Sequence, residues 1–294
     1  MTQPAMGAVA VVGAGFMGAG IAQVCAQSGF AVRLFDNNSG VLEAALATMR
    51  RSVDKLHSKG WLPDPAETVM ARVQPAASLD ELAGVDLVVE AVFEDEALKK
   101  ELFAALEPLV GPAAFIASNT SSIPISRLAA GLAHPQRFLG LHFFGPVPFM
   151  PLVEVVAGVD TAPEVFAAGL SFVSSLGKHA VQVRRDIPGF VMNRIFAAAF
   201  RECQELVARG VTSVEDIDAG MRLGYGWRVG PFEIADNAGL DTFLRVGRSM
   251  QALEETHLYS ECGLVEKLVE QGKLGRKSGE GFYRYDSNGK KQQD

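Results

Sequence analysis

A histidine and a glutamate stand alone in two apolar runs of the sequence. His142 lies in Leu141-His142-Phe143-Phe144, and Glu154 lies in Leu152-Val153-Glu154-Val155-Val156. An ionisable side chain in a strand of this kind is costly to bury without a partner, so we expect the two to pair. A carboxylate on one imidazole nitrogen fixes the tautomer, and the other nitrogen then exchanges a proton with a substrate. The pattern indicates a general base, against the alternative of a histidine that is simply satisfied within the core.

The elements that would position this pair begin with a strand, a glycine-rich turn and a helix. The apolar run Ala8–Val12 leads through Gly13, Gly15 and Gly18 into the helical stretch Ala19–Ser28. In a dinucleotide-binding turn the first glycine allows the tight turn, the second lets the backbone approach a pyrophosphate, and the third lets helix and strand pack closely. The alternative is a glycine-rich turn that binds nothing.

An acidic residue follows the next strand. The apolar run Ala31–Phe35 ends in Asp36, which comes 18 residues after Gly18. This is close to the spacing at which a carboxylate meets the adenosine ribose of a dinucleotide. An acid here would repel a 2′-phosphate, so the sequence favours NAD over NADP.

Polar residues also follow the later strands of the predicted sheet. The strand Asp86–Val92 is followed by Glu94 and Lys99, and the strand Ala113–Ala117 opens into Ser118–Ser122. Ligands of open parallel sheets bind beyond the carboxyl ends of the strands, so these residues are candidates for a cofactor cleft. The alternatives are an acid at a helix start, a solvated lysine and hydroxyls that cap a helix.

The character of the chain changes at Asp186-Ile187-Pro188-Gly189, which we interpret as a domain boundary. Strands and helices alternate before it, and nearly all of the sequence after it has helical periodicity. The predicted fold is α/β, a Rossmann-type doubly wound sheet over residues 1–185 followed by a smaller all-α domain over residues 186–294.

Composition excludes several other classes of protein. The chain has 294 residues with 48% apolar and 21% charged side chains, as expected for a globular protein of about two domains. A net charge of −7 offers no general basic field for nucleic acid or an anionic membrane. The three cysteines, Cys25, Cys203 and Cys262, lack metal-ligand spacing, so we expect reduced thiols, no metal site and a cytoplasmic protein. No apolar run has the length of a membrane span or a signal peptide.

The chain resembles the short-chain L-3-hydroxyacyl-CoA dehydrogenases, of the bacterial 3-hydroxybutyryl-CoA dehydrogenase type. Seven stretches carry the resemblance and occur in the family's order over nearly the full length. They are GAGFMGAGIA at 13–22, EAVFED at 90–95, SNTSS at 118–122, HFFGPVPFMPLVEVV at 142–156, DIPGFVMNR at 186–194, VGPFEIAD at 229–236 and GEGFY at 279–283.

The resemblance implies a role for individual residues. His142 is expected to act as general base or acid with Glu154 orienting it, while Ser121 and Asn193 bind the substrate oxygens near the reacting carbon. The expected cofactor is NAD, and the expected reaction is the reversible oxidation of an L-3-hydroxyacyl-CoA, with 3-hydroxybutyryl-CoA as the expected substrate, in fatty acid metabolism. The helical domain is expected to form a homodimer. The residues expected along the cofactor are Gly13, Gly15, Phe16, Met17, Gly18, Asp36, Glu94, Lys99 and Lys277, and those expected at the nucleotide part of CoA are Ser52 and Lys59.

Two departures from the family pattern affect substrate preference and rate. The family usually has asparagine at the position of Gly145, and lysine is common at that of Pro151. Neither change removes the pair of His142 and Glu154. The alternatives are a dehydrogenase of a larger or carboxylated substrate such as 3-hydroxyadipyl-CoA or of a free 3-hydroxy acid, and a non-catalytic NAD-binding protein with a structural or sensory role.

Overall fold

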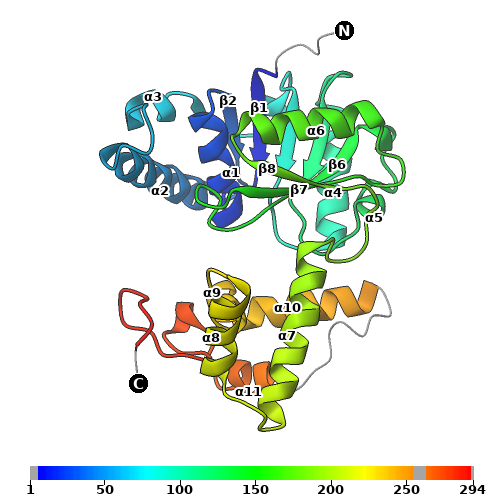
Figure 1. Ribbon diagram of the computed structural model, residues 1–294. Coiled ribbons are helices and arrows are strands. Elements are labelled where there is room, and N and C mark those ends of the chain that lie inside the picture. The colour runs from blue at the N-terminus through cyan, green and yellow to red at the C-terminus, as the bar shows by residue number, and fades with distance from the viewer. Residues whose placement is uncertain (1–5, 254–262, 293–294) are drawn as a thin grey trace. The chain divides into compact units, whose positions relative to one another are not determined.

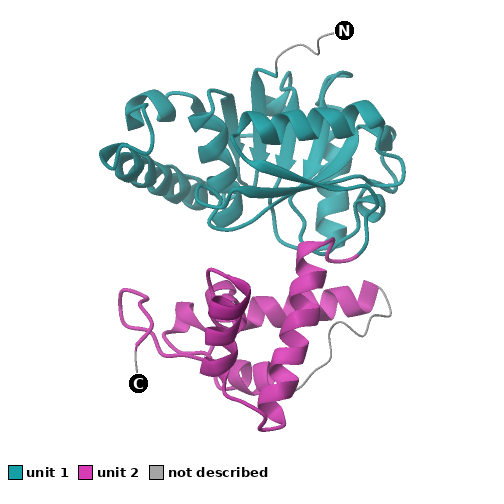
Figure 2. Ribbon diagram, viewed as in Figure 1, with its two compact units in different colours: residues 1–187 teal, residues 188–294 magenta. Residues whose placement is uncertain are grey.

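The computed structural model describes residues 6–253 and 263–292. The chain folds into two compact units, Met1–Ile187 and Pro188–Asp294 (Figure 2). Helical periodicity in the sequence predicts a helix from Leu240 to Glu254; it is present as far as Leu253, and both Glu254 and Cys262 lie outside the described residues.

An eight-stranded sheet forms the centre of the first unit, in the order β3-β2-β1-β4-β5-β6-β7-β8 (Figure 1). All neighbouring strands are parallel except β6 and β7, which pair antiparallel. The order reverses between β1 and β4, the place where open α/β sheets bind ligands. The strands are β1 (Ala8–Val12), β2 (Ala31–Phe35), β3 (Val73–Ala76), β4 (Leu87–Glu90), β5 (Phe115–Ser118), β6 (Phe138–Phe143), β7 (Leu152–Val156) and β8 (His179–Val183).

Helices of the first unit pack on the sheet and on one another through their apolar faces. In α2, for example, Asn38 caps the start with its side chain, and Leu42, Ala45, Met49, Val53 and Leu56 are buried along one side. Helix α1 packs on β1 and β2, and α6 packs on β6, β7 and β8. The helices of this unit are α1 (Phe16–Gln27), α2 (Ser39–Ser58), α3 (Ala66–Met70), α4 (Glu96–Leu106), α5 (Ile125–Ala129) and α6 (Pro163–Ser175), with short 3-10 turns η1 (Leu79–Leu82) and η2 (Pro135–Arg137).

Two local predictions were wrong. Helix α1 begins at Phe16, three residues before the predicted start at Ala19, so Gly18 is a helical residue. A Cβ at Gly18 would lie 1.7 Å from the carbonyl oxygen of Gly13, so the absence of a side chain is what lets the first helical turn form against the strand. The segment from Trp61 to Glu67 contains Pro63 and Pro65, which predict a loop, but α3 already begins within it at Ala66.

In the described residues of the second unit, five helices pack around an aromatic cluster. The Phe200 ring packs edge to face against Phe232 and Phe243, with ring centres 5.2 and 4.8 Å apart, and Phe282 joins Phe232 at 4.7 Å. The helices are α7 (Met192–Ala208), α8 (Val214–Tyr225), α9 (Pro231–Ala238), α10 (Leu240–Leu253) and α11 (Leu264–Glu270), followed by the 3-10 turn η3 (Arg276–Ser278). The observed architecture confirms the predicted fold class, a Rossmann-type sheet followed by a helical domain.

Two buried aspartates give a structural role to two of the stretches that carry the family resemblance. Asp218 accepts hydrogen bonds from the amides of Phe232 and Glu233 at the start of α9 and from the Tyr283 hydroxyl. Asp236 accepts bonds from the amides of Phe282 and Tyr283. Burial raises the pKa of both aspartates despite these bonds. The stretches at 229–236 and 279–283 therefore hold the second unit together.

Candidate active site

The carboxyl ends of four parallel strands meet at one edge of the sheet. In register, Val12 pairs with Glu90, Glu90 pairs with Ser118, and Ser118 pairs with Gly140. His142 is two residues further along β6, which is about 7 Å beyond the level of Gly140. The sheet thus brings the end of β1, the acid of β4, the hydroxyl-rich loop after β5 and the histidine of β6 to the same edge.

His142 and Glu154 lie directly opposite each other in the antiparallel pair of β6 and β7. Nδ1 of His142 is 2.7 Å from Oε2 of Glu154, and the residues are 6% and 0% exposed. The contact predicted from the two apolar runs is therefore present. A carboxylate accepts, so Nδ1 carries the proton in this bond and the lone pair of the neutral ring is on Nε2.

Contacts made by residues around His142 hold β6 and the turn after it in place. The Phe144 ring lies 4.5 Å from the imidazole, centre to centre, and the amide of Phe143 donates to Oδ1 of Asn119 at 2.9 Å. Lys178 donates to the carbonyls of Val147 and Met150, both at 2.7 Å. The turn that follows β6, which contains a cis peptide between Gly145 and Pro146, is thus tied to β8.

The glycine turn between β1 and α1 has the space that a dinucleotide needs. Gly13 has φ of +98°, and a Cβ there would lie 2.6 Å from the Ala91 carbonyl oxygen. At Gly15 nothing lies within 4 Å of a Cβ. Helix α1 has neither a side-chain cap nor an acid in its first turn, so its amides and its positive dipole end face this opening. These features fit a pyrophosphate.

Asp36 closes the other side of the turn. Its Oδ2 accepts from the Ala14 amide at 2.8 Å, and its Oδ1 accepts from the Asn38 amide at 2.9 Å. The carboxylate is held at the end of β2 beside the glycine turn, the position expected for an adenosine ribose acceptor. Phe16 and Met17 are the first two residues of α1, and both are near Gly145: an ideal Cβ at 145 would be 2.6 Å from Phe16 Cε1 and 3.4 Å from Met17 Sδ.

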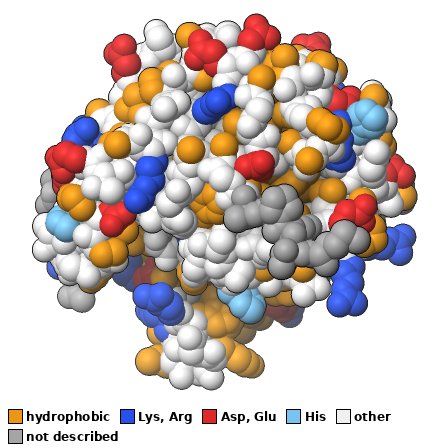
Figure 3. Space-filling view, turned by 90° about the horizontal axis from the view of Figure 1, so that it is seen from above, with side chains coloured by type: hydrophobic (Ala, Val, Ile, Leu, Met, Phe, Trp, Pro, Cys, Tyr) orange, Lys and Arg blue, Asp and Glu red, His pale blue; other side chains and the backbone are white. Residues whose placement is uncertain are grey.

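Ser52 and Lys59 lie two turns apart on α2 and just beyond its end. Oγ of Ser52 accepts from Nε2 of Gln23 at 2.9 Å, and Nζ of Lys59 is 4.9 Å from the centre of the Trp61 ring. The charge of Lys59 is on the surface, and an anionic group can reach it. On the face of the molecule in Figure 3, basic side chains are scattered among acidic ones.

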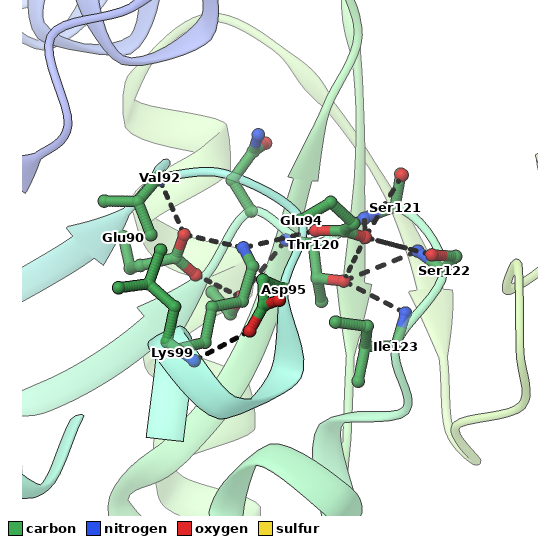
Figure 4. A network of polar contacts seen from close by, with 12 residues as sticks. Glu90, Val92, Glu94, Asp95, Lys99, Thr120, Ser121, Ser122 and Ile123 are labelled. Atoms are coloured by element: carbon green, nitrogen blue, oxygen red, sulfur yellow. Dashed lines mark hydrogen bonds and ion pairs between the residues drawn. The ribbon is translucent and has the colours of Figure 1, made fainter. Parts of the chain in front are cut away.

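Glu94 holds the loop that carries Ser121 (Figure 4). Its Oε1 is 2.6 Å from the Thr120 hydroxyl, 2.9 Å from the Ser121 amide and 3.1 Å from the Ser122 amide. The hydroxyls of Ser121 and Ser122 also donate to this oxygen, at 3.3 and 3.0 Å. Glu94 therefore contacts the loop through one oxygen and presents the other, Oε2, to Lys99 at 3.2 Å.

Lys99 is 1% exposed, and its ammonium is 2.6 Å from Oε1 of Glu90. Burial raises the pKa of Glu90, although Lys99 and the hydrogen bond from Ser118 oppose the rise. Burial would also raise the pKa of Glu94, but there the charge of Lys99 and the bonds from Thr120 and Ser121 prevail and hold the pKa below its usual range.

Sequence reasoning missed Glu90, Ser118 and Thr120 as parts of this network. One signal was available, because Lys99 shares the buried stripe of α4 with Phe103 and Leu106, four and seven residues on. A lysine on a buried stripe requires an acid, and Glu90 ends a strand that is buried throughout.

Two predicted site residues belong to the second unit. Asn193 is in the first turn of α7. Lys277 is on η3, and its ammonium is 2.5 Å from Oδ1 of Asp241. In the part of the chain that the structure describes, no helix is both long and apolar enough to cross a membrane.

Comparison with known proteins agrees with this geometry. The family model described as "3-hydroxyacyl-CoA dehydrogenase, NAD binding domain" matches residues 8–187, and "3-hydroxyacyl-CoA dehydrogenase, C-terminal domain" matches residues 189–285. The chain is 43% identical over 275 residues to a probable 3-hydroxybutyryl-CoA dehydrogenase of Deinococcus radiodurans, covering 94% of this chain and 99% of the relative. It is also 43% identical over 281 residues to the 3-hydroxybutyryl-CoA dehydrogenase of Bradyrhizobium diazoefficiens, covering 94% of each.

A solved structure is similar over the same length. The crystal structure of (S)-3-hydroxybutyryl-CoA dehydrogenase PaaH1 from Ralstonia eutropha superposes with a TM-score of 0.90 at 38% identity, covering 96% of this chain and 100% of that one. The first unit is thus an NAD-binding domain, and the chain belongs to the 3-hydroxyacyl-CoA dehydrogenase family.

Proposed function

We propose that this protein catalyses the reversible NAD-dependent oxidation of an L-3-hydroxyacyl-CoA to the 3-ketoacyl-CoA, with 3-hydroxybutyryl-CoA as substrate. The observation that carries the proposal is the contact of 2.7 Å between His142 Nδ1 and Glu154 Oε2, at the sheet edge that also holds the glycine turn. A buried imidazole held by a buried carboxylate at a cofactor edge is suited to proton transfer.

In the oxidation, Nε2 of His142 takes the proton of the 3-hydroxyl group. Glu154 holds the ring in the tautomer that leaves Nε2 able to accept, and its negative charge stabilises the imidazolium that forms. When bound, NAD supplies the acceptor for the hydride that leaves C3. In the reverse direction, His142 returns the proton to the carbonyl oxygen.

The proposed contacts to ligand divide between the elements already described. Gly13, Gly15 and Gly18 form the pyrophosphate turn with the backbone of Phe16 and Met17, and Asp36 binds the ribose. Ser121 and Asn193 bind substrate oxygens, and Glu94 and Lys277 lie along the cofactor. Residues 186–294 are proposed to complete the substrate site and to form a homodimer. We also propose that the protein is cytoplasmic and acts in fatty acid metabolism.

The test is NADH oxidation followed by absorbance, with acetoacetyl-CoA and free acetoacetate in parallel and NADPH as the alternative cofactor. We expect turnover of the thioester with NADH, and at least tenfold lower rates with free acetoacetate and with NADPH. Turnover of free acetoacetate at the thioester's rate would overturn the assignment of an acyl-CoA substrate. Activity confined to longer or carboxylated acyl-CoAs would overturn the assignment of 3-hydroxybutyryl-CoA as substrate but would leave the proposed reaction type in place.

A charge reversal at Lys59 tests how the CoA portion binds. Lys59→Glu places an anion beside Trp61, so KM for acetoacetyl-CoA should rise several-fold while KM for a thioester truncated at pantetheine stays unchanged. Lys55→Glu, one turn earlier on the same helix, is the matched control for net charge. An equal rise for both substrates would show that Lys59 does not bind the nucleotide.

A further inference from the structure

Lys99 is held in a way that leaves little freedom for a ligand contact. It is 1% exposed, with its ammonium 2.6 Å from Glu90 Oε1 and 3.2 Å from Glu94 Oε2. Moving this ammonium toward a ligand would leave two carboxylates without their cation, one of them fully buried. The geometry therefore suits a residue that holds its neighbours in place.

Glu94 transmits this constraint to the loop after β5. The loop turns around one oxygen of Glu94, which receives the amides of Ser121 and Ser122 and the Thr120 hydroxyl. An ionised carboxylate oxygen binds several donors more strongly than a neutral one, and a protonated carboxyl would offer fewer acceptor sites. The ammonium of Lys99 keeps Glu94 ionised and fixes its second oxygen.

Glu90 anchors the network to the sheet (Figure 4). Its Oε1 accepts from the Val92 amide at 2.7 Å as well as from Lys99, and its Oε2 accepts from the Ser118 hydroxyl at 2.5 Å. The Ser118 oxygen in turn accepts from the Thr120 amide at 3.1 Å. The first residue of the segment 118–122 is thus bound to Glu90 directly, and its last residue is connected to Lys99 through Glu94.

The same segment is tied to the catalytic strand. Oδ1 of Asn119 accepts from the amide of Phe143, the residue after His142. A displacement of the loop would therefore change where Ser121 stands relative to the imidazole. Misplacement of a substrate-positioning group by about 1 Å costs on the order of a hundredfold in rate.

We propose that Glu90 and Lys99 are positioning residues which act through Glu94 to hold Ser121 in register with His142 for the acyl-CoA. The inference rests on the proposed function, in which Ser121 binds a substrate oxygen. It assigns Lys99 no direct contact with NAD.

The variants separate positioning from folding. Lys99→Met leaves the Glu90 carboxylate buried without its cation, so the thermal midpoint of this variant should fall. Adding Glu90→Gln removes the unpaired charge and should recover most of the midpoint. In the double variant we expect kcat/KM for acetoacetyl-CoA to stay at least tenfold below wild type, with the NADH dissociation constant within about threefold. Lys100→Met is the matched control, because Lys100 is one position along the same helix and makes a partly buried ion pair with Glu96, outside the Glu90–Lys99–Glu94 network.

Hydrogen exchange reports on the loop without substrate. The amides of Ser121 and Ser122 should exchange at least tenfold faster in the double variant, as they should in Glu94→Ala, which keeps the Glu90–Lys99 pair and tests the loop if the Lys99 variants fail to fold. This measurement stands even if the wild-type protein turned over no acyl-CoA, which would refute the proposed function alone.

Three results would overturn the inference. Recovery of kcat/KM together with the thermal midpoint in the double variant would make the role purely structural. A loss of NADH affinity that accounts for the loss of rate would make Lys99 a cofactor ligand. Unchanged exchange at Ser121 and Ser122 in Glu94→Ala would show that Glu94 does not hold the loop.

Discussion

Substituting Gly15 with alanine should weaken cofactor binding at least tenfold while leaving the folded protein as stable as before. Gly15 has φ −64° and ψ −170°, a conformation that alanine adopts readily, and no atom lies within 4 Å of an added Cβ. Alanine lowers the entropy of the unfolded chain, which stabilises by about 0.4–1 kcal/mol. It is a poorer N-cap than glycine by a similar amount, so the net change in the free energy of unfolding is about zero.

The open space at Gly15 is where the backbone must approach a pyrophosphate, so a methyl group there opposes the ligand directly. We expect the NADH dissociation constant to rise at least tenfold, about 1.4 kcal/mol, while the thermal midpoint without cofactor moves by no more than about 2 °C. Gly18→Ala is the comparison variant, because it adds the same methyl group three residues further along. Its Cβ would lie 1.7 Å from the Gly13 carbonyl oxygen, so backbone must shift and stability should fall by about 1–3 kcal/mol or more.

The assay is a fluorescence titration with NADH beside a thermal melt of each variant without cofactor. Wild-type affinity in Gly15→Ala would refute the assignment of the turn to the pyrophosphate. A midpoint of Gly15→Ala as low as that of Gly18→Ala would refute the steric reasoning, because the two positions differ chiefly in what a Cβ would meet.

Three further predictions concern the site and its surroundings. His142→Ala should lower turnover of acetoacetyl-CoA by about 10²–10⁴ while NADH affinity changes less than threefold, measured by steady-state rates and fluorescence titration; full turnover would exclude His142 as the base. Gly145→Ala should change NADH affinity less than threefold, because its Cβ would lie 2.6 Å from Phe16 Cε1 but this ring is 70% exposed and can turn aside; a tenfold loss of affinity would mean that the ring cannot move. Burial raises the pKa of Cys25 to about 12 and that of Cys203 to about 11. In a Cys262→Ser variant, Ellman's reagent at pH 8 should therefore find two thiols only after denaturation, and rapid reaction of the native protein would contradict their burial.

The sequence was sufficient to predict the pairing of His142 and Glu154, because the signal for it is in the residues that immediately surround each of them. Each residue interrupts an apolar run, and a buried strand tolerates an ionisable group only with a partner. The direction of the pairing was not predictable. The connection of eight residues from Phe144 to Pro151 contains three prolines, and its cis peptide at Gly145-Pro146 and the Lys178 bonds to its carbonyls are features of the folded chain.

The glycine turn shows a similar limit. Spacing alone predicted which glycines form the turn, and the start of α1 was still misplaced by three residues. Glycine has a low helix propensity, so local sequence favours a helix that starts after Gly18. In the folded protein a different constraint decides, since only a residue without a side chain can occupy a helical position this close to Gly13. A tertiary contact thus reverses the local preference.

The burial of Lys99 was not predictable from the sequence, because a lysine that follows a strand end is equally compatible with a cofactor cleft and with a solvated helix face. Its partners lie nine residues back at the end of β4 and five residues back in the next loop, and no periodic pattern joins a strand end, a helix face and a loop. The one local signal was its place on the buried stripe of α4 with Phe103 and Leu106. An ammonium at this position is not solvated, so it must be paired with carboxylates, and one of these, Glu94, also binds the loop that carries Ser121. The burial of Lys99 therefore makes the conformation of the Ser121 loop depend on this lysine.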